Sequence, residues 1–280
     1  MSFSQPQMML ARYGDPRYIE RNMQVIRNMG FLSGINPAGH RHFKAYYFSH
    51  ELLHPRQLYH CDVPENGRYT KPGIYVMWYA RHPRVMQWCR EWGDAWVDHS
   101  LKTKKGKPTG FIPSEIVYET DQVGGKSGKW YRIAGYPGYD FAAGSWTTKH
   151  LMGQLVANAK LFNNPRYVEP IRRIVQWKKD HHDAPYGPEG SDGWILRKET
   201  HAEKMWDRWE RLRDGLKPND RMDQLVKQLR EISAWHASTW EMNTQEVIST
   251  DRVPLPAHPS RVLMHMYTGG SGSMQAYYPD

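Results

Sequence analysis

The chain has few cysteines and no long apolar run. Only Cys61 and Cys89 occur among its 280 residues, too few for a disulfide framework or a thiolate zinc site. No run approaches the roughly 20 apolar residues that span a bilayer, so we expect no membrane partner. The first ten residues show no signal peptide. We leave the compartment open: secreted or periplasmic, if the natural N-terminus is absent here.

Common catalytic and metal-binding motifs are also missing. The sequence contains no HExxH, CxxC or GxSxG motif, and "TGGSGS" near its end is not followed by the GK[ST] of a phosphate loop. The runs "HRH" at 40–42 and "HHD" at 181–183 could supply metal ligands. Neither matches a known ligand spacing, so the sequence assigns no metal and no cofactor.

Positive charge and aromatic side chains are abundant. Lys and Arg total 38 against 29 Asp and Glu, a net charge of +9, and the chain has 12 Trp and 17 Tyr. A basic surface concentrates nucleic acid, acidic lipid or acidic polysaccharide. Tyr and Trp rings suit wet binding surfaces, where one end of the ring is apolar and the other polar. This composition favours an anionic ligand.

One pattern occurs three times: a short polar residue or histidine, a proline, and then apolar residues at helical spacing. The copies read "GDPRYIERNMQVIR", "RHPRVMQWCREWGD" and "NNPRYVEPIRRIVQ", with prolines at Pro16, Pro83 and Pro165. Proline is favoured at the first position of a helix, after a capping residue. A helical run closes before each copy, so the pattern predicts three helical hairpins.

The hairpins recur at unequal intervals, which is not typical of a short-period solenoid. We therefore expect a mainly α fold, an (α/α) toroid that forms an incomplete barrel of helical hairpins with long inter-helix loops. Further helices are predicted at 199–215 and 220–236, and a short β-type segment at 261–267. The toroid is expected to cover 1–250, and 251–280 is a Pro/Gly-rich tail. The tail resembles the start of a β domain, so we expect the chain to be a fragment or to lack that domain.

Two long loops, 36–73 and 106–150, carry most of the unusual chemistry, and loops of this length are often functional. Elimination at a uronic acid needs a base for the C5 proton and a group that stabilises the carboxylate. His42 or Tyr47 would act as base or acid, and Asn66 and Arg68 would neutralise the uronate. The expected substrate-binding residues are His40, Arg41, Tyr46, Trp130, Tyr131, Tyr139, Asp140 and Trp146.

Two segments resemble bacterial (α/α)-toroid carbohydrate-active proteins, related to polysaccharide lyases and toroidal glycosidases. They are the loop "KPTGFIPSEIVYETDQVGG" and the hairpin "LVANAKLFNNPRYVEPIRRIV", and the resemblance extends over 12–177. Its motifs are signatures of the fold, and no catalytic set of a lyase family matches residue by residue. The resemblance implies a toroid that acts on an acidic polysaccharide or oligosaccharide, with a β domain after the helices in many such lyases.

Two alternatives remain open. A toroidal glycoside hydrolase would use a carboxylate pair, for which Glu115, Glu119, Asp121 and Asp140 are candidates. A non-catalytic helical-repeat protein would bind nucleic acid or acidic glycan on a basic face. We rank nucleic acid lower, because the basic runs are local and the aromatic residues cluster in the loops.

Overall fold

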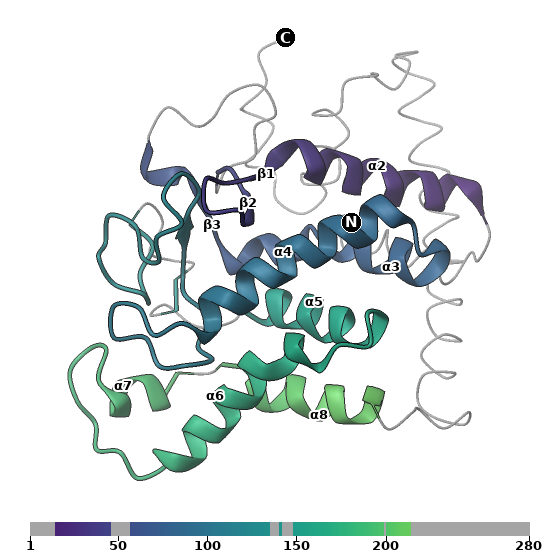
Figure 1. Cartoon of the computed structure of the whole chain (residues 1–280). Coiled ribbons are helices and arrows are strands. Elements are labelled where there is room, and N and C mark those ends of the chain that lie inside the picture. The colour runs from purple at the N-terminus through teal and green to yellow at the C-terminus, as the bar shows by residue number, and fades with distance from the viewer. Residues whose placement is uncertain (1–14, 46–56, 135–139, 142–147, 199, 214–280) are drawn as a thin grey trace, which may run out of the picture. The chain divides into compact units, whose positions relative to one another are not determined.

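The computed structural model describes residues 15–45, 57–134, 140–141, 148–198 and 200–213 (Figure 1). Their helices are α2 (Pro16–Leu32), α3 (Lys71–Ala80), α4 (Pro83–Leu101), α5 (Thr148–Leu161), α6 (Glu169–Asp180), α7 (Asp192–Leu196) and α8 (Ala202–Arg213). The prediction of a mainly α fold is confirmed. The described residues form two compact units, which divide between Asn28 and Met29. The site described below lies in the unit that begins at Met29.

The helical hairpins predicted from the second and third copies of the pattern are present. Arg81 and His82 join α3 to α4, and the left-handed backbone of Arg81 (φ 46°) makes the reversal. In the third copy α5 is followed by the 3-10 turn η5 (Pro165–Val168) and then by α6, and the Asn164 side chain accepts a hydrogen bond from the backbone NH of Arg166. Proline thus begins each second element, as its fixed φ favours.

The first copy is described only from Asp15 onward. The Asp15 carboxylate accepts a hydrogen bond from the backbone NH of Arg17 at 3.0 Å, so it caps α2 at the expected place. The preceding helical run lies outside the described residues, as do the helix predicted at 220–236, the strand at 261–267 and the boundary after residue 250. The helix predicted at 199–215 is confirmed as α8. Among the described helices, none has the length and apolar character that a membrane crossing requires.

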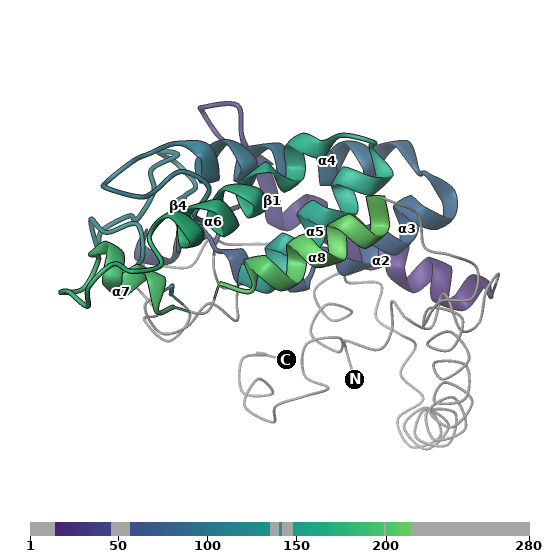
Figure 2. The same ribbon diagram turned by 90° about the horizontal axis from the view of Figure 1, so that it is seen from below.

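The buried face of α4 is rich in tryptophan. Trp88, Trp92 and Trp96 follow one another at i+4 spacing, which places them on one side of the helix, and all three are buried. Helices α3, α4 and α5 pack against one another, and α8 packs on α5 and α6 (Figures 1 and 2). Cys61 and Cys89 are buried cysteines that form no disulfide with a described residue.

Two short antiparallel ribbons order the long loops. In the first, β1 (Ser33–Ile35) pairs with β2 (Arg41–Phe43), and β2 packs against α4. In the second, β3 (Cys61–Asp62) pairs with β4 (Ile116–Val117). Because β3 belongs to the loop 36–73 and β4 to the loop 106–150, this ribbon joins the two loops that the sequence singles out.

The 3-10 turn η2 (Pro64–Arg68) packs tightly against the first turn of α5. A Cβ added to Gly67 would lie 2.6 Å from the backbone nitrogen of Leu151. Gly67→Ala is therefore expected to lower the free energy of unfolding by about 1 to 3 kcal/mol, because backbone cannot move aside as a side chain can.

The matched control for Gly67→Ala is Gly153→Ala, within α5 itself. A Cβ at Gly153 would meet nothing within 4 Å, and alanine is favoured over glycine in a helix by about 1 kcal/mol. Urea denaturation should therefore move the two variants in opposite directions. Equal effects would contradict the close approach of η2 to α5.

Candidate functional site

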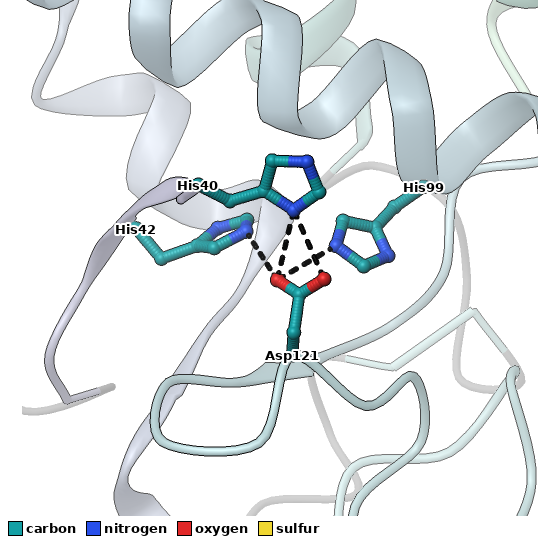
Figure 3. Close-up of side chains that lie close together, drawn as sticks. All are labelled: His40, His42, His99 and Asp121. Atoms are coloured by element: carbon teal, nitrogen blue, oxygen red, sulfur yellow. Dashed lines mark hydrogen bonds and ion pairs between the residues drawn. The ribbon is translucent and has the colours of Figure 1, made fainter. Parts of the chain in front are cut away.

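Four side chains from three parts of the chain meet at the edge of α4 (Figure 3). His40 precedes β2, His42 lies in β2, His99 lies in the last turn of α4, and Asp121 follows β4. One donor atom from each residue lies within 4.8 Å of the others, and these four form the group in the described part of the chain that could hold a metal ion. We call them the His–Asp cluster.

Asp121 is the centre of the His–Asp cluster. Its carboxylate oxygens lie 3.0 and 2.9 Å from Nδ1 of His40, and one of them is 3.1 Å from Nε2 of His99. The Asn36 side chain donates to the same carboxylate at 2.7 Å. Burial would raise the pKa of Asp121, but its interactions with His42, Asn36 and His40 hold it well below its usual range. Asp121 is therefore a carboxylate across the physiological range.

A buried carboxylate, Asp62, fixes the orientation of His42. One Asp62 oxygen lies 3.1 Å from Nδ1 of His42 and accepts the indole NH groups of Trp92 and Trp96 at 2.8 and 3.0 Å. The other accepts the Asn66 amide at 2.8 Å. Since Nδ1 donates to Asp62, Nε2 of His42 is left facing Asp121, at 3.6 Å.

The two most buried histidines differ in pKa. Burial would lower the pKa of His42, but its interactions with the carboxylates of Asp121 and Asp62 raise it above its ordinary value. For His99, burial and repulsion from His42 lower the pKa to about 4. The His99 imidazole is therefore neutral near pH 7, with a lone pair that it can donate to a cation.

The sequence of α4 explains the position of His99. Trp92, Trp96 and His99 stand at i, i+4 and i+7, so they share one face of the helix. The first two bind Asp62 and the third reaches Asp121. At the end of α4 the buried Lys107 amine donates to the backbone carbonyl of Ser100 at 2.5 Å, which ties down the turn beside His99.

Three of the residues predicted from sequence come together: His40, His42 and Asp121. Two others have partners elsewhere, because the Asn66 amide holds Asp62 and the Arg68 guanidinium contacts Glu65. Arg41 pairs with Glu91 at 2.6 Å. The candidates that lie outside the described residues are Tyr46, Tyr47, Tyr139 and Trp146.

The predicted sugar-stacking residues of the second loop are packed inside the protein. Trp130 and Tyr131 are 1% and 8% exposed, and Trp130 contacts Phe111 and Phe141 edge-on or tilted. Asp140 is fully buried, with Arg132 at 3.2 Å. Rings buried in this way stabilise the loop, and they could stack on a sugar only if the loop opened.

The four candidate carboxylates of the hydrolase alternative are separately engaged or buried. Asp121 lies in the His–Asp cluster, Asp140 pairs with Arg132, and Glu119 contacts His60 at 2.6 Å. Glu115 is 1% exposed, and burial raises its pKa to about 7.

Glu115→Gln should remove a pH dependence of stability. The folded pKa of Glu115 is raised from 4.5 to about 7, so its contribution is favourable below pH 4.5 and is lost as the pH rises through 7. Burial is the main cause of the rise; Cys61, the backbone of Ala134 and Lys105 lower this pKa, and Asp140 raises it. Relative to the glutamine variant, the free energy of unfolding of the wild type should fall by about 3 kcal/mol as the pH rises from below 4.5 to above 7.

Urea denaturation at pH 5 and pH 8 measures the difference between wild type and Glu115→Gln. Asp207→Asn, at an exposed position on α8, serves as the control and should show no such change. If the stabilities of the wild type and the glutamine variant change equally between pH 5 and pH 8, the raised pKa of Glu115 is contradicted.

Two important residues of the site were not predicted from sequence: His99 and Asp62. The available signal was the spacing W-x3-W-x2-H on α4, which places polar ring nitrogens on a face that also buries tryptophan. Asp62 carries no such signal, because its four donors come from β2, α4 and η2.

No protein-family model, curated protein or solved structure matches this chain. Its function is therefore argued from the His–Asp cluster and the loops that form it.

Proposed function

We propose that this chain is a carbohydrate-active enzyme with an (α/α)-toroid fold that cleaves an acidic polysaccharide or oligosaccharide by β-elimination at a uronic acid. The observation that carries the proposal is the junction of the two long loops. Strands β3 and β4 pair, and the loops deliver His40, His42 and Asp121 to one place at the end of α4. The pKa values of His42 and Asp121 are shifted, and titratable groups of this kind that gather in one place are typical of functional sites.

The fold part of the proposal is supported by the helical hairpins. The pairs α3–α4 and α5–α6 are consecutive in sequence, and α3, α4 and α5 pack side by side. This is the packing unit from which toroids are built. The charge of +9 supports an anionic substrate.

In the proposed reaction a base removes the C5 proton of the uronate. The electron pair forms the C4–C5 double bond, the C4–O bond breaks, and the departing sugar oxygen takes up a proton. The charge that develops on the uronate carboxylate must be stabilised. We assign that role to the His–Asp cluster, in which His40 is the most exposed histidine, at 19%.

The role of His42 changes from the one predicted from sequence. The His42 side chain is 0% exposed, so neither water nor a ligand reaches it from the surface, and its Nδ1 is bound to Asp62. A base must come within hydrogen-bond reach of the proton that it removes. We therefore assign His42 to the support of the cluster and Tyr47, the other candidate in the same loop, to proton transfer.

Elimination ranks ahead of hydrolysis for a structural reason. A hydrolase needs two carboxyl groups roughly 5 to 9.5 Å apart across the bond that is cut. Among the described residues, Asp121, Glu119 and Asp140 already bind cationic or histidine partners. Glu115, the remaining candidate, is buried.

The test is a screen of uronate-containing polysaccharides, including sulfated ones, followed by ultraviolet absorbance of the unsaturated product and by release of reducing ends. We expect both signals to rise, and Tyr47→Phe to abolish both. Tyr186→Phe is the matched control, because Tyr186 is 72% exposed. Reducing ends without absorbance would establish hydrolysis instead, and binding without either signal would establish a non-catalytic glycan-binding protein.

A further inference from the structure

We propose that the His–Asp cluster binds one divalent transition-metal ion, through His40 Nδ1, His42 Nε2, His99 Nε2 and the Asp121 carboxylate. The role of the ion in catalysis rests on the proposed function, since the ion would stabilise the uronate carboxylate. Binding of the ion does not depend on any substrate.

The spacing of the ligand atoms suits such an ion. The three histidine nitrogens lie 2.9, 3.6 and 3.1 Å from an oxygen of Asp121. In a tetrahedral site with bonds of 2.0 to 2.1 Å, neighbouring ligand atoms are about 3.4 Å apart. Figure 3 shows the four side chains turned toward one point, so small side-chain rotations would complete the coordination.

Two buried nitrogens point to a missing partner. Nε2 of His42 and Nε2 of His99 are buried, and the side chains are 0% and 3% exposed. Both nitrogens face an oxygen of Asp121, at 3.6 and 3.1 Å, but neither contact has the geometry of a hydrogen bond. Leaving a buried polar atom unsatisfied costs about 1 to 3 kcal/mol. A metal ion between these nitrogens and Asp121 would accept the lone pairs of both, whereas the cluster without an ion leaves them without a well-formed hydrogen bond.

The surroundings of the histidines are those of metal ligands. A histidine bound to a metal almost always donates its other ring NH to a carboxylate or carbonyl. His42 faces Asp62 at 3.1 Å through Nδ1, and His40 faces Asp98 at 3.5 Å through Nε2. Each carboxylate contacts the ring nitrogen that is not the proposed ligand, so it can help to orient the ring.

The ligand set favours zinc or a similar transition metal over magnesium or calcium. It contains three imidazole nitrogens and one carboxylate, and imidazole suits zinc, copper, iron and nickel, whereas the alkaline-earth ions prefer all-oxygen sites. The ion would also add positive charge where the uronate carboxylate is proposed to lie. Asn66 and Arg68, which the sequence assigned to the uronate, are occupied by Asp62 and Glu65.

The experiment uses the full chain, stripped with a chelator and titrated with Zn²⁺ or Co²⁺. Calorimetry and elemental analysis should give one ion per chain, and Co²⁺ should show the visible absorption of a tetrahedral nitrogen–oxygen site. His99→Gln and the nearly isosteric Asp121→Asn should each weaken binding at least 100-fold. His182→Gln is the matched control, since His182 is exposed at the end of α6 and should bind as the wild type does.

Circular dichroism of each stripped variant separates lost binding from lost folding. A folded wild type that takes up no ion, or His99→Gln and Asp121→Asn variants that still bind one ion tightly, would overturn the inference. Metal binding without turnover of any uronate would contradict the proposed function alone. Turnover by a chain that binds no metal would contradict this inference alone.

Discussion

Asp62→Ala is expected to destabilise the unit that begins at Met29 by about 3 to 5 kcal/mol, the cost of leaving buried partners of a charge unpaired. The Asp62 carboxylate accepts hydrogen bonds from Trp92, Trp96 and Asn66 and faces the ring NH of His42. Alanine would leave these four donors in a site that is 0% exposed. The histidine would lose its orientation at the same time, so metal affinity should fall by about 10- to 100-fold.

Urea denaturation of the metal-free chain measures the first effect and metal titration the second. The matched control is Asp180→Ala, because Asp180 is an exposed carboxylate that accepts a single hydrogen bond from Gln176. Its effect should stay within about 0.5 kcal/mol, as for most surface substitutions. An Asp62→Ala variant as stable as this control would show that Asp62 does not organise the site.

Metal binding is expected to raise the thermal midpoint of the same unit by roughly 10 °C. A ligand that binds only the folded state at a thousand times its Kd contributes about 4 kcal/mol, and each kcal/mol shifts the midpoint of a domain of this size by about 2 to 4 °C. The ligands come from β2 and the residue before it, from α4 and from the loop after β4. One ion would therefore hold together three segments that are distant in sequence.

Differential scanning calorimetry with Zn²⁺, and again after chelation, measures this shift. Asp121→Asn should show little shift with Zn²⁺, whereas His182→Gln should shift as the wild type does. Equal midpoints with and without Zn²⁺ in the wild type would contradict a bound ion that links the three segments.

Local sequence signals predicted the helices well. The prolines at 83 and 165 begin α4 and η5, and Asn164 caps its turn as expected. These signals act within one turn of the chain, so they can be read without knowledge of the fold. A toroid would require helical hairpins to close around one axis. The order of residues does not encode such closure locally, so the toroid stays a prediction.

The site was predicted in part, for a similar reason. His40, His42 and Asp121 lie in two long loops that are rich in polar and charged residues, and this composition was enough to identify them as candidates. His99 sits among buried tryptophans on α4, and Asp62 lies in a loop that also holds Glu65, with nothing local to distinguish it. Only the packing of β2 against α4 and β3, with the hydrogen bonds from Trp92 and Trp96 to Asp62, shows what they do. Trp130 and Tyr131 are core residues because they pack against Phe111, Phe141 and Trp194, although the abundance of aromatic residues in the loops favoured a binding surface.

The labelling rates of the two buried thiols can report how often the protein around each of them opens. Burial raises the pKa of both Cys61 and Cys89, and only the thiolate reacts with disulfide reagents. Modification therefore requires the chain around each sulfur to open. Cys61 is the neighbour of Asp62 in β3, and Cys89 lies in the middle of α4. Their separate labelling rates report whether the ribbon that joins the loops opens alone or only when the helices come apart.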